Sequence, residues 1–190
     1  VVKLLDVGSV TITATYEDVV ATFDIIVSEK IAAYINDLGY ATIQEAIDNA
    51  NSGETINVNR GTFDEILTID KPITLVGHPN NLSVLTNDIN IEKDLEDITI
   101  KGFTFKDDFQ VISTGTLKGF TFTNNIVKDT NLEGQYLPTS RINVPAIIQL
   151  YSLAGTNIFG DINITNNIFE NIKSDIISID RTMIDEEINI

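Results

Sequence analysis

The chain has 190 residues, of which 43% are hydrophobic, and its formal net charge is −16. This hydrophobic fraction is that of a globular protein and excludes a disordered chain. The charge disfavours nucleic acid and anionic membrane surfaces as partners. No apolar run approaches the roughly 18 residues of a membrane-spanning helix, so membrane insertion is not expected.

There is no cysteine, which suits a secreted Gram-positive protein better than a small secreted animal domain. No signal peptide is visible at Val1, and both ends of the chain resemble the interiors of strands. We therefore expect a fragment of a larger secreted or cell-surface protein.

Residues 1–28 differ from the rest of the chain. Gly8–Tyr16 alternates between apolar residues and threonines, which predicts a half-buried antiparallel strand. Glu17-Asp18 is a plausible turn, and Val19–Val27 a second strand. The resulting hairpin is marginal alone.

This segment, Gly-Ser-Val-Thr-Ile-Thr-Ala-Thr-Tyr followed by Ala-Thr-Phe-Asp-Ile-Ile-Val, resembles the C-terminal end of a bacterial immunoglobulin-like domain of the repeated cell-surface type. The resemblance implies that 1–28 supplies the last strands of such a domain. The other strands would precede Val1 or come from another chain, unless the hairpin packs on the second domain, 29–190. Residues 29–39 link the two parts, and 31–38 are either a short helix or a strand.

Residues 40–77 predict one helix followed by three short strands. Thr42 is a good N-cap with Glu45 three residues on, and an apolar stripe follows before Gly53, which predicts a helix over 42–51. The expected strands are Thr55–Val58, Glu65–Ile69 and Ile73–Val76, separated by turns at 59–61 and 70–72.

The motifs Thr-Ile-Gln-Glu-Ala-Ile, Gly-Thr-Phe-Asp-Glu and Lys-Pro-Ile-Thr-Leu-Val-Gly resemble the start of right-handed parallel β-helix proteins of the pectate lyase and pectin methylesterase kind. The resemblance covers about 40 residues. It implies a mainly β fold, a right-handed parallel β-helix over 29–190 with an N-terminal capping helix, truncated relative to the family's enzymes. It carries no catalytic residue across.

A sequence repeat in the second half of the chain supports the prediction that the chain winds in successive coils. Residues 98–107 align with 120–129 at an offset of 120 − 98 = 22, and with 162–171 at a further 162 − 120 = 42, which we interpret as two periods of 21. The pairs Asn124-Asn125 and Asn166-Asn167 fall at the turns. They could bind sugars or ions, but asparagine tolerates left-handed turns and can form hydrogen-bonded ladders, so we favour a structural role.

Residues 129–146 form a predicted loop, where binding residues collect on a rigid scaffold. The candidate ligand-binding residues are Gln135, Tyr136, Arg141 and Tyr151. Arg141 is a weak candidate for a catalytic base, because the resemblance to pectate lyases implies an arginine base and Ca²⁺. The single histidine, His78, is expected to be a solvated turn residue. One histidine and no cysteine are too few ligands for a zinc site.

Calcium is the one metal that the sequence leaves open. Asp107, Asp108 and Asp129 recur at equivalent turn positions, and carboxylate oxygens suit Ca²⁺. No Asp-x-Asp-x-Asp loop accompanies them, so ordinary surface carboxylates are the simpler interpretation.

Three functions remain open. The first is a non-catalytic structural, adhesive or glycan-binding module that contacts a polysaccharide or cell-surface glycan. The second is part of a polysaccharide lyase or related enzyme acting on an acidic polysaccharide. The third is a self-assembling surface-layer or fibre subunit, associating through strand edges or an open last coil.

Overall fold

The computed structural model describes residues 8–27, 30–132, 146–151, 158–180, 183–184 and 188–189. The chain divides into two compact units, Val1–Ile31 and Ala32–Ile190. The predicted loop residues Gln135, Tyr136 and Arg141 lie outside the described residues.

The first unit is a hairpin of β1 (Gly8–Tyr16) and β2 (Val19–Val27), as predicted. Its register places Ile12 opposite Phe23 and Val10 opposite Ile25, so the apolar residues share one face. Phe23 is 68% exposed. A two-stranded ribbon has no second layer against which to bury such a face.

The second unit is mainly β, with one α-helix, α1 (Ile43–Asn49), and a 3-10 helix, η1 (Pro79–Asn81), among the described residues. Its strands form four sheets, which we number I to IV. Sheet I contains β7 (Leu67–Ile69), β10 (Ile89–Ile91), β14 (Val111–Ser113), β18 (Ala146–Tyr151) and β22 (Asp175–Asp180). Sheet IV contains β11 (Leu95–Glu96), β15 (Leu117–Lys118), β19 (Ile158–Gly160) and β23 (Met183–Ile184).

Sheets II and III complete the unit. In spatial order, sheet II contains β4 (Leu38–Tyr40), β3 (Ala33–Ile35), β5 (Thr55–Val58), β8 (Thr74–Val76), β12 (Thr99–Lys101), β16 (Thr121–Thr123), β20 (Ile162–Thr165) and β24 (Ile188–Asn189). Sheet III contains β6 (Gly61–Phe63), β9 (Ser83–Leu85), β13 (Phe103–Phe105), β17 (Ile126–Lys128) and β21 (Ile168–Glu170).

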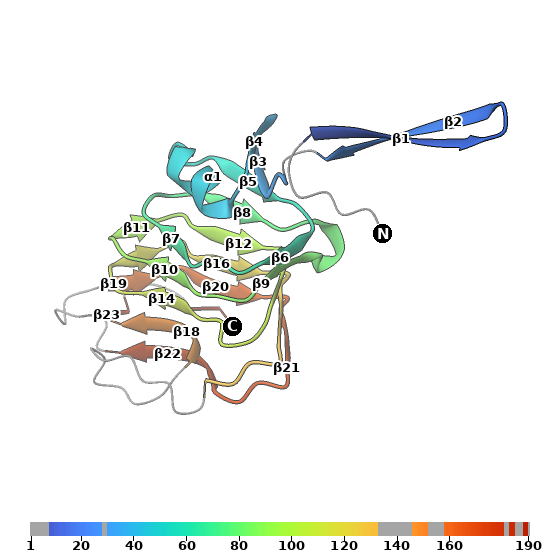
Figure 1. The fold of residues 1–190 in the computed structure, drawn as a ribbon. Coiled ribbons are helices and arrows are strands. Elements are labelled where there is room, and N and C mark those ends of the chain that lie inside the picture. The colour runs from blue at the N-terminus through green and yellow to red at the C-terminus, as the bar shows by residue number, and fades with distance from the viewer. Residues whose placement is uncertain are drawn as a thin grey trace. The chain divides into compact units, whose positions relative to one another are not determined.

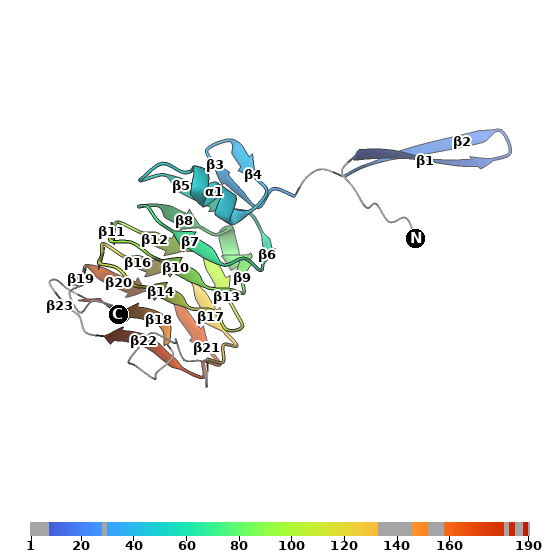
Figure 2. The same cartoon turned by 60° about the vertical axis from the view of Figure 1, so that its left-hand side comes forward.

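From β10 onward the chain visits these sheets in a repeating order, from I through IV to II and III, and we call each passage a circuit. The earlier passage from β7 to β8 leads from sheet I to sheet II without a strand in sheet IV. Each strand pairs in parallel with its counterpart in the next circuit, so like strands stack side by side (Figure 1 and Figure 2). Parallel strands need such crossovers, because a hairpin reverses the chain. The arrangement is compatible with a parallel β-helix.

The circuits have unequal lengths. Thr99 pairs with Thr121 and Thr121 pairs with Asn163, so successive partners are 121 − 99 = 22 and 163 − 121 = 42 residues apart. The interval of 42 is therefore one enlarged circuit, and its interpretation as two periods of 21 is wrong. The additional residues lie between β17 and β18 and between β18 and β19.

The predicted helix forms as α1, capped at Thr42. The backbone N–H of Glu45 donates to Thr42 Oγ1 at 3.0 Å, which is one half of the predicted capping box, whereas Glu45 Oε2 accepts from the N–H of Ala41, the residue before the N-cap, at 3.0 Å. Ile43, Ala46 and Ile47 are buried in the core cluster shared with the sheets. The helix ends at Asn49, earlier than predicted, because Ala50 is already extended.

Gln44 joins this helix to the edge of sheet I. Its side-chain Oε1 accepts from Thr68 N–H at 2.8 Å, and its Nε2 donates to Thr68 O at 3.2 Å. Since β7 is the outermost strand of sheet I, the Gln44 amide takes the place of a further strand at that residue. Lys71 Nζ in turn donates to Ile47 O at 3.1 Å, near the end of the helix.

The prediction was incomplete elsewhere in this region. Residues 61–63, placed in a turn, form β6, and the strand expected over 65–69 begins at Leu67. Residues 33–35 form β3, which pairs antiparallel with β4 and β5. Short strands of three residues carry too little periodicity to be separated from their turns by pattern alone.

Left-handed residues mark the corners of the circuits. Three columns recur at the same intervals of 22 and 42 residues along the chain. They are Asp97, Gly119 and Asp161 between sheets IV and II; Gly102, Asn124 and Asn166 between II and III; and Asp107, Asp129 and Asn171 between III and I. Asn, Asp and Gly adopt positive φ most readily. The sequence repeat therefore reflects the backbone conformation needed at the corners as well as the apolar positions of the core.

Phenylalanines fill the middle of the core. The Phe105 ring lies 3.9 Å from that of Phe109 and 5.3 Å from that of Phe122, centroid to centroid. All three side chains are fully buried. Stacked rings of this kind contribute beyond their buried area, and they join adjacent circuits.

Candidate functional site

The predicted loop site can be placed only in part. Tyr151 is the last residue of β18 and pairs with Asp180 of β22. The other three candidates, at 135, 136 and 141, connect β17 to β18. In the chain, this segment therefore leads from sheet III to sheet I.

The outward face of sheet I carries polar residues that sequence reasoning missed. Gln110 and Gln149 are 4% and 2% exposed. Gln110 Nε2 donates to Ala146 O at 2.8 Å, whereas Gln149 Oε1 is buried and has no hydrogen-bond partner among the residues that the structure describes. The signal was available, because Asp88 to Ile91 and Gln110 to Ser113 are offset by the same 22 residues.

Asp88 is the ionisable group of this face with a perturbed pKa. Burial raises the pKa of its carboxyl, and the negative charge of Asp108 raises it further. The hydrogen bond that Asp88 Oδ1 accepts from Gln110 N–H, at 2.9 Å, opposes the rise. A half-buried carboxyl that holds its proton longer than usual can act as a proton donor.

The three candidate calcium ligands are described. Asp107 and Asp129 both have positive φ at equivalent corners, as the repeat predicted, and Asp129 Oδ1 accepts from Asn171 Nδ2 at 3.0 Å. Asp108 follows Asp107 and is exposed. Among the described residues, no three His, Cys, Asp or Glu side chains gather closely enough to hold a metal ion.

The asparagine pairs at the II–III corner have the structural role that we favoured. Asn124 and Asn166 have φ of 55° and 56°. Asn167 Oδ1 accepts from Asn125 N–H at 2.9 Å, and Asn125 Oδ1 accepts from Phe103 N–H at 3.0 Å. The second asparagine of each pair thus hydrogen-bonds to the preceding circuit.

His78 also lies in a turn, as predicted. It precedes η1, its ring Nδ1 lies 3.0 Å from Pro79 O, and its backbone N–H donates to Ser83 Oγ at 2.8 Å. The side chain is partly exposed.

The outward face of sheet II is the most regular polar surface of the described residues. Alternation along each strand buries one set of side chains, such as Ile100 and Phe122, and turns the other set outward. The outward set forms two rows across five strands. One row is Thr55, Thr74, Thr99, Thr121 and Asn163; the other is Asn57, Val76, Lys101, Thr123 and Thr165.

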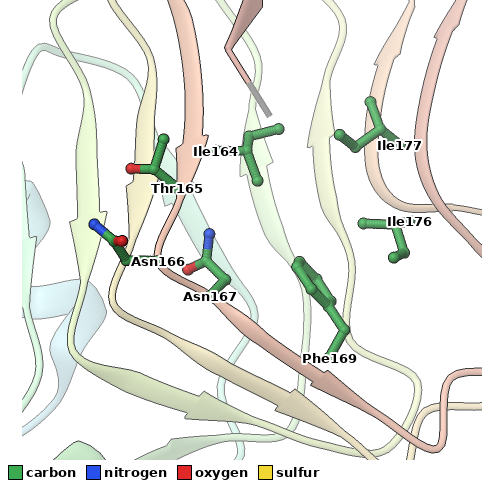
Figure 3. A pocket seen from close by; sticks show the side chains of 7 residues that line it. All are labelled: Ile164, Thr165, Asn166, Asn167, Phe169, Ile176 and Ile177. Carbon is green, nitrogen blue, oxygen red and sulfur yellow. The ribbon is translucent and has the colours of Figure 1, made fainter.

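An apolar pocket of about 410 Å³ lies beside β20, β21 and β22. Figure 3 shows Ile164, Phe169, Ile176 and Ile177 around the space, with Thr165, Asn166 and Asn167 along one side. Nearby Ile168 is 51% exposed. β21 is also the outermost of the described strands of sheet III, so these apolar side chains lie at an edge of that sheet as far as the structure describes it.

No family model, curated protein or solved structure matches the chain. Within the described residues, no helix is both long and apolar enough to cross a membrane.

Proposed function

We propose that residues 29–190 are a right-handed parallel β-helix with α1 as its N-terminal capping helix, similar to the pectate lyase and pectin methylesterase fold. The repeating order of sheets and the parallel pairing of successive circuits support this proposal. We propose further that residues 1–28 are the C-terminal strands of a bacterial immunoglobulin-like domain, whose missing sheet would cover the apolar face that includes Phe23.

The function that we propose for this fold is a non-catalytic structural, adhesive or glycan-binding module of a secreted or cell-surface bacterial protein. The observation that carries it is the outward face of sheet II, where register is kept across five successive strands. Side chains fixed on such strands present a preorganised surface, which lowers the entropic cost of binding. Hydroxyl and amide groups suit sugar hydroxyls.

A polysaccharide lyase or related enzyme is the competing function, and Asp88 is the observation that favours it. Its carboxyl has a raised pKa, and it immediately precedes β10 of sheet I, the sheet whose strand β18 follows the loop with Arg141 in the chain. Such chemistry requires a group that can give a proton to the leaving oxygen, and a carboxyl whose pKa is raised by burial keeps its proton to higher pH. Arg141 would be the base that removes the proton beside a uronate carboxylate.

One experiment separates these functions. The protein is incubated with acidic and neutral polysaccharides, with and without Ca²⁺, while absorbance from unsaturated uronates and binding are measured in parallel. We expect binding without turnover. Absorbance that grows with wild-type protein and is lost in both Arg141→Ala and Asp88→Asn would overturn the proposal in favour of the lyase.

A further inference from the structure

We propose that the outward face of sheet II binds an extended neutral polysaccharide. This inference rests on the proposed glycan-binding role and names the face and the class of sugar. It deepens that role, because a non-catalytic module could equally bind through its loops or serve only as a spacer.

The two rows of this face form a regular grid. Neighbouring strands are about 4.8 Å apart and alternate residues along a strand about 6.6 Å apart in any such sheet. Thr99 and Thr121 are direct partners in one row, and Thr123 and Thr165 in the other. The Thr123 hydroxyl donates to Thr165 O at 2.8 Å, and its oxygen lies 3.2 Å from the Thr165 hydroxyl oxygen, so Thr123 offers a ligand an acceptor rather than a donor. A ligand with regularly repeating hydroxyl groups matches a grid of this kind.

The circuits keep this face uninterrupted. From sheet II to sheet III, each of three circuits takes the same number of residues between paired positions: 104 − 99 = 5, 126 − 121 = 5 and 168 − 163 = 5. The enlarged circuit places its additional residues at other corners. Among the described residues, no inserted segment separates sheet II from sheet III, so the strands that a long ligand would cross follow one another at the II–III corner without a change in length.

The distribution of charged residues favours a neutral ligand on this face. The chain carries 28 Asp and Glu residues, yet none is among the ten outward residues, and Lys101 is the one charged member. Asp97 and Asp161 flank the face at the IV–II corner. A polyuronate would meet this acidic rim and a net charge of −16 with one lysine to offset them.

The chemistry of the side chains agrees with this assignment. A threonine hydroxyl both donates and accepts a hydrogen bond, and an asparagine side chain does the same with two atoms. Sugar hydroxyls have the same dual character. The threonine methyl groups additionally offer apolar contact to the C–H faces of a sugar ring.

The test measures binding of the full chain to soluble β-glucan, mannan, xylan and polygalacturonate. The variant Thr99→Val/Thr121→Val removes two central hydroxyls but keeps the side-chain shape and the strand preference. The matched control, Thr62→Val/Thr68→Val, makes the same change on the outward faces of sheets III and I. Circular dichroism verifies that both variants are folded.

We expect binding to at least one neutral polysaccharide, about tenfold weaker in Thr99→Val/Thr121→Val, since each lost hydrogen bond costs about two- to tenfold. The control should bind like wild type. Equal loss in both variants, no loss in either, binding of polygalacturonate alone, or no binding would each overturn the inference. None of these four outcomes contradicts the proposed non-catalytic function, as long as the protein does not cleave the polysaccharides. Cleavage of a polysaccharide by the wild-type protein would contradict that function.

Discussion

Asn167 and Asn125 are 42 residues apart in sequence, and the side-chain Oδ1 of Asn167 accepts a 2.9 Å hydrogen bond from the backbone N–H of Asn125. Each amide also donates backward: Asn167 Nδ2 to Phe122 O at 2.8 Å and Asn125 Nδ2 to Ile100 O at 3.1 Å. The two side chains thus hydrogen-bond to backbone groups of the preceding circuit and join consecutive circuits at this corner.

Replacing the buried member of this pair should be costly. Asn125→Ala leaves Phe103 N–H and Ile100 O without the partners they now have, and Asn125 is 1% exposed. We expect a loss of about 2–4 kcal/mol in the free energy of unfolding, measured by urea denaturation. Asn90→Ala, on the partly exposed face of sheet I, is the control and should cost much less. Equal losses would contradict the assigned role.

The link between Gln44 and Thr68 can be tested separately. Gln44→Ala removes both hydrogen bonds to the edge of β7, and we expect a loss of about 1–2 kcal/mol. Gln44→Glu keeps an acceptor for Thr68 N–H but places a carboxylate against Thr68 O and Asp48 Oδ1, to which Gln44 Nε2 now donates, so its loss should be at least as large at neutral pH. Hydrogen exchange at the Thr68 amide should accelerate in Gln44→Ala, and unchanged protection there would refute the link.

Gly77 is the position where a side chain cannot be accommodated. A Cβ atom there would overlap the carbonyl group of Gly102 in the next circuit, which is backbone and cannot turn aside. We expect Gly77→Ala to cost about 3 kcal/mol. Gly53→Ala is the matched control, because nothing lies within 4 Å of its Cβ and only the φ of +85° is unfavourable, at about 1–2 kcal/mol.

Two carboxyls should respond to pH in opposite directions. Because burial raises the pKa of Asp88, its ionisation opposes folding, and stability from this group falls as pH rises through its folded pKa. Asp88→Asn keeps an acceptor for Gln110 N–H, so we expect it to be more stable than wild type at pH 7 but not at pH 3, as measured by urea denaturation.

Asp70 provides the opposite case. The hydrogen bond from Lys93, 3.0 Å long, lowers the pKa of Asp70, with help from Lys71. Its contribution is therefore present above the unfolded pKa and lost as pH falls through the folded value. Asp70→Asn should be slightly less stable than wild type at pH 7, and the difference should vanish in acid or high salt, because the pair is exposed.

The sequence predicted those parts of the structure that have local signals. The helix follows from Thr42, Glu45 and its apolar stripe, and the hairpin from strict alternation around Glu17. The 22-residue repeat was visible because Asn, Asp and Gly return at corners that need positive φ.

The remaining parts depend on contacts between circuits, which no local pattern encodes. β6 has only three residues, the first of which is Gly61, so its pairing with β9 defines it rather than its composition. The length of the enlarged circuit is set by which strands pair, and alignment alone could not distinguish one circuit from two. Asp88 was missed because its raised pKa comes from burial by neighbouring circuits.

The enlarged circuit also has a consequence for how the chain assembles. Most partners are about 22 residues apart, so circuits can form one after another from α1 without long-range searching. Where the interval is 42, the closure is nearly twice as long, yet loop-closure entropy adds only about 0.6 kcal/mol per doubling. That corner is therefore where the chain can gain sequence, or an inserted peptide, at the smallest cost to folding.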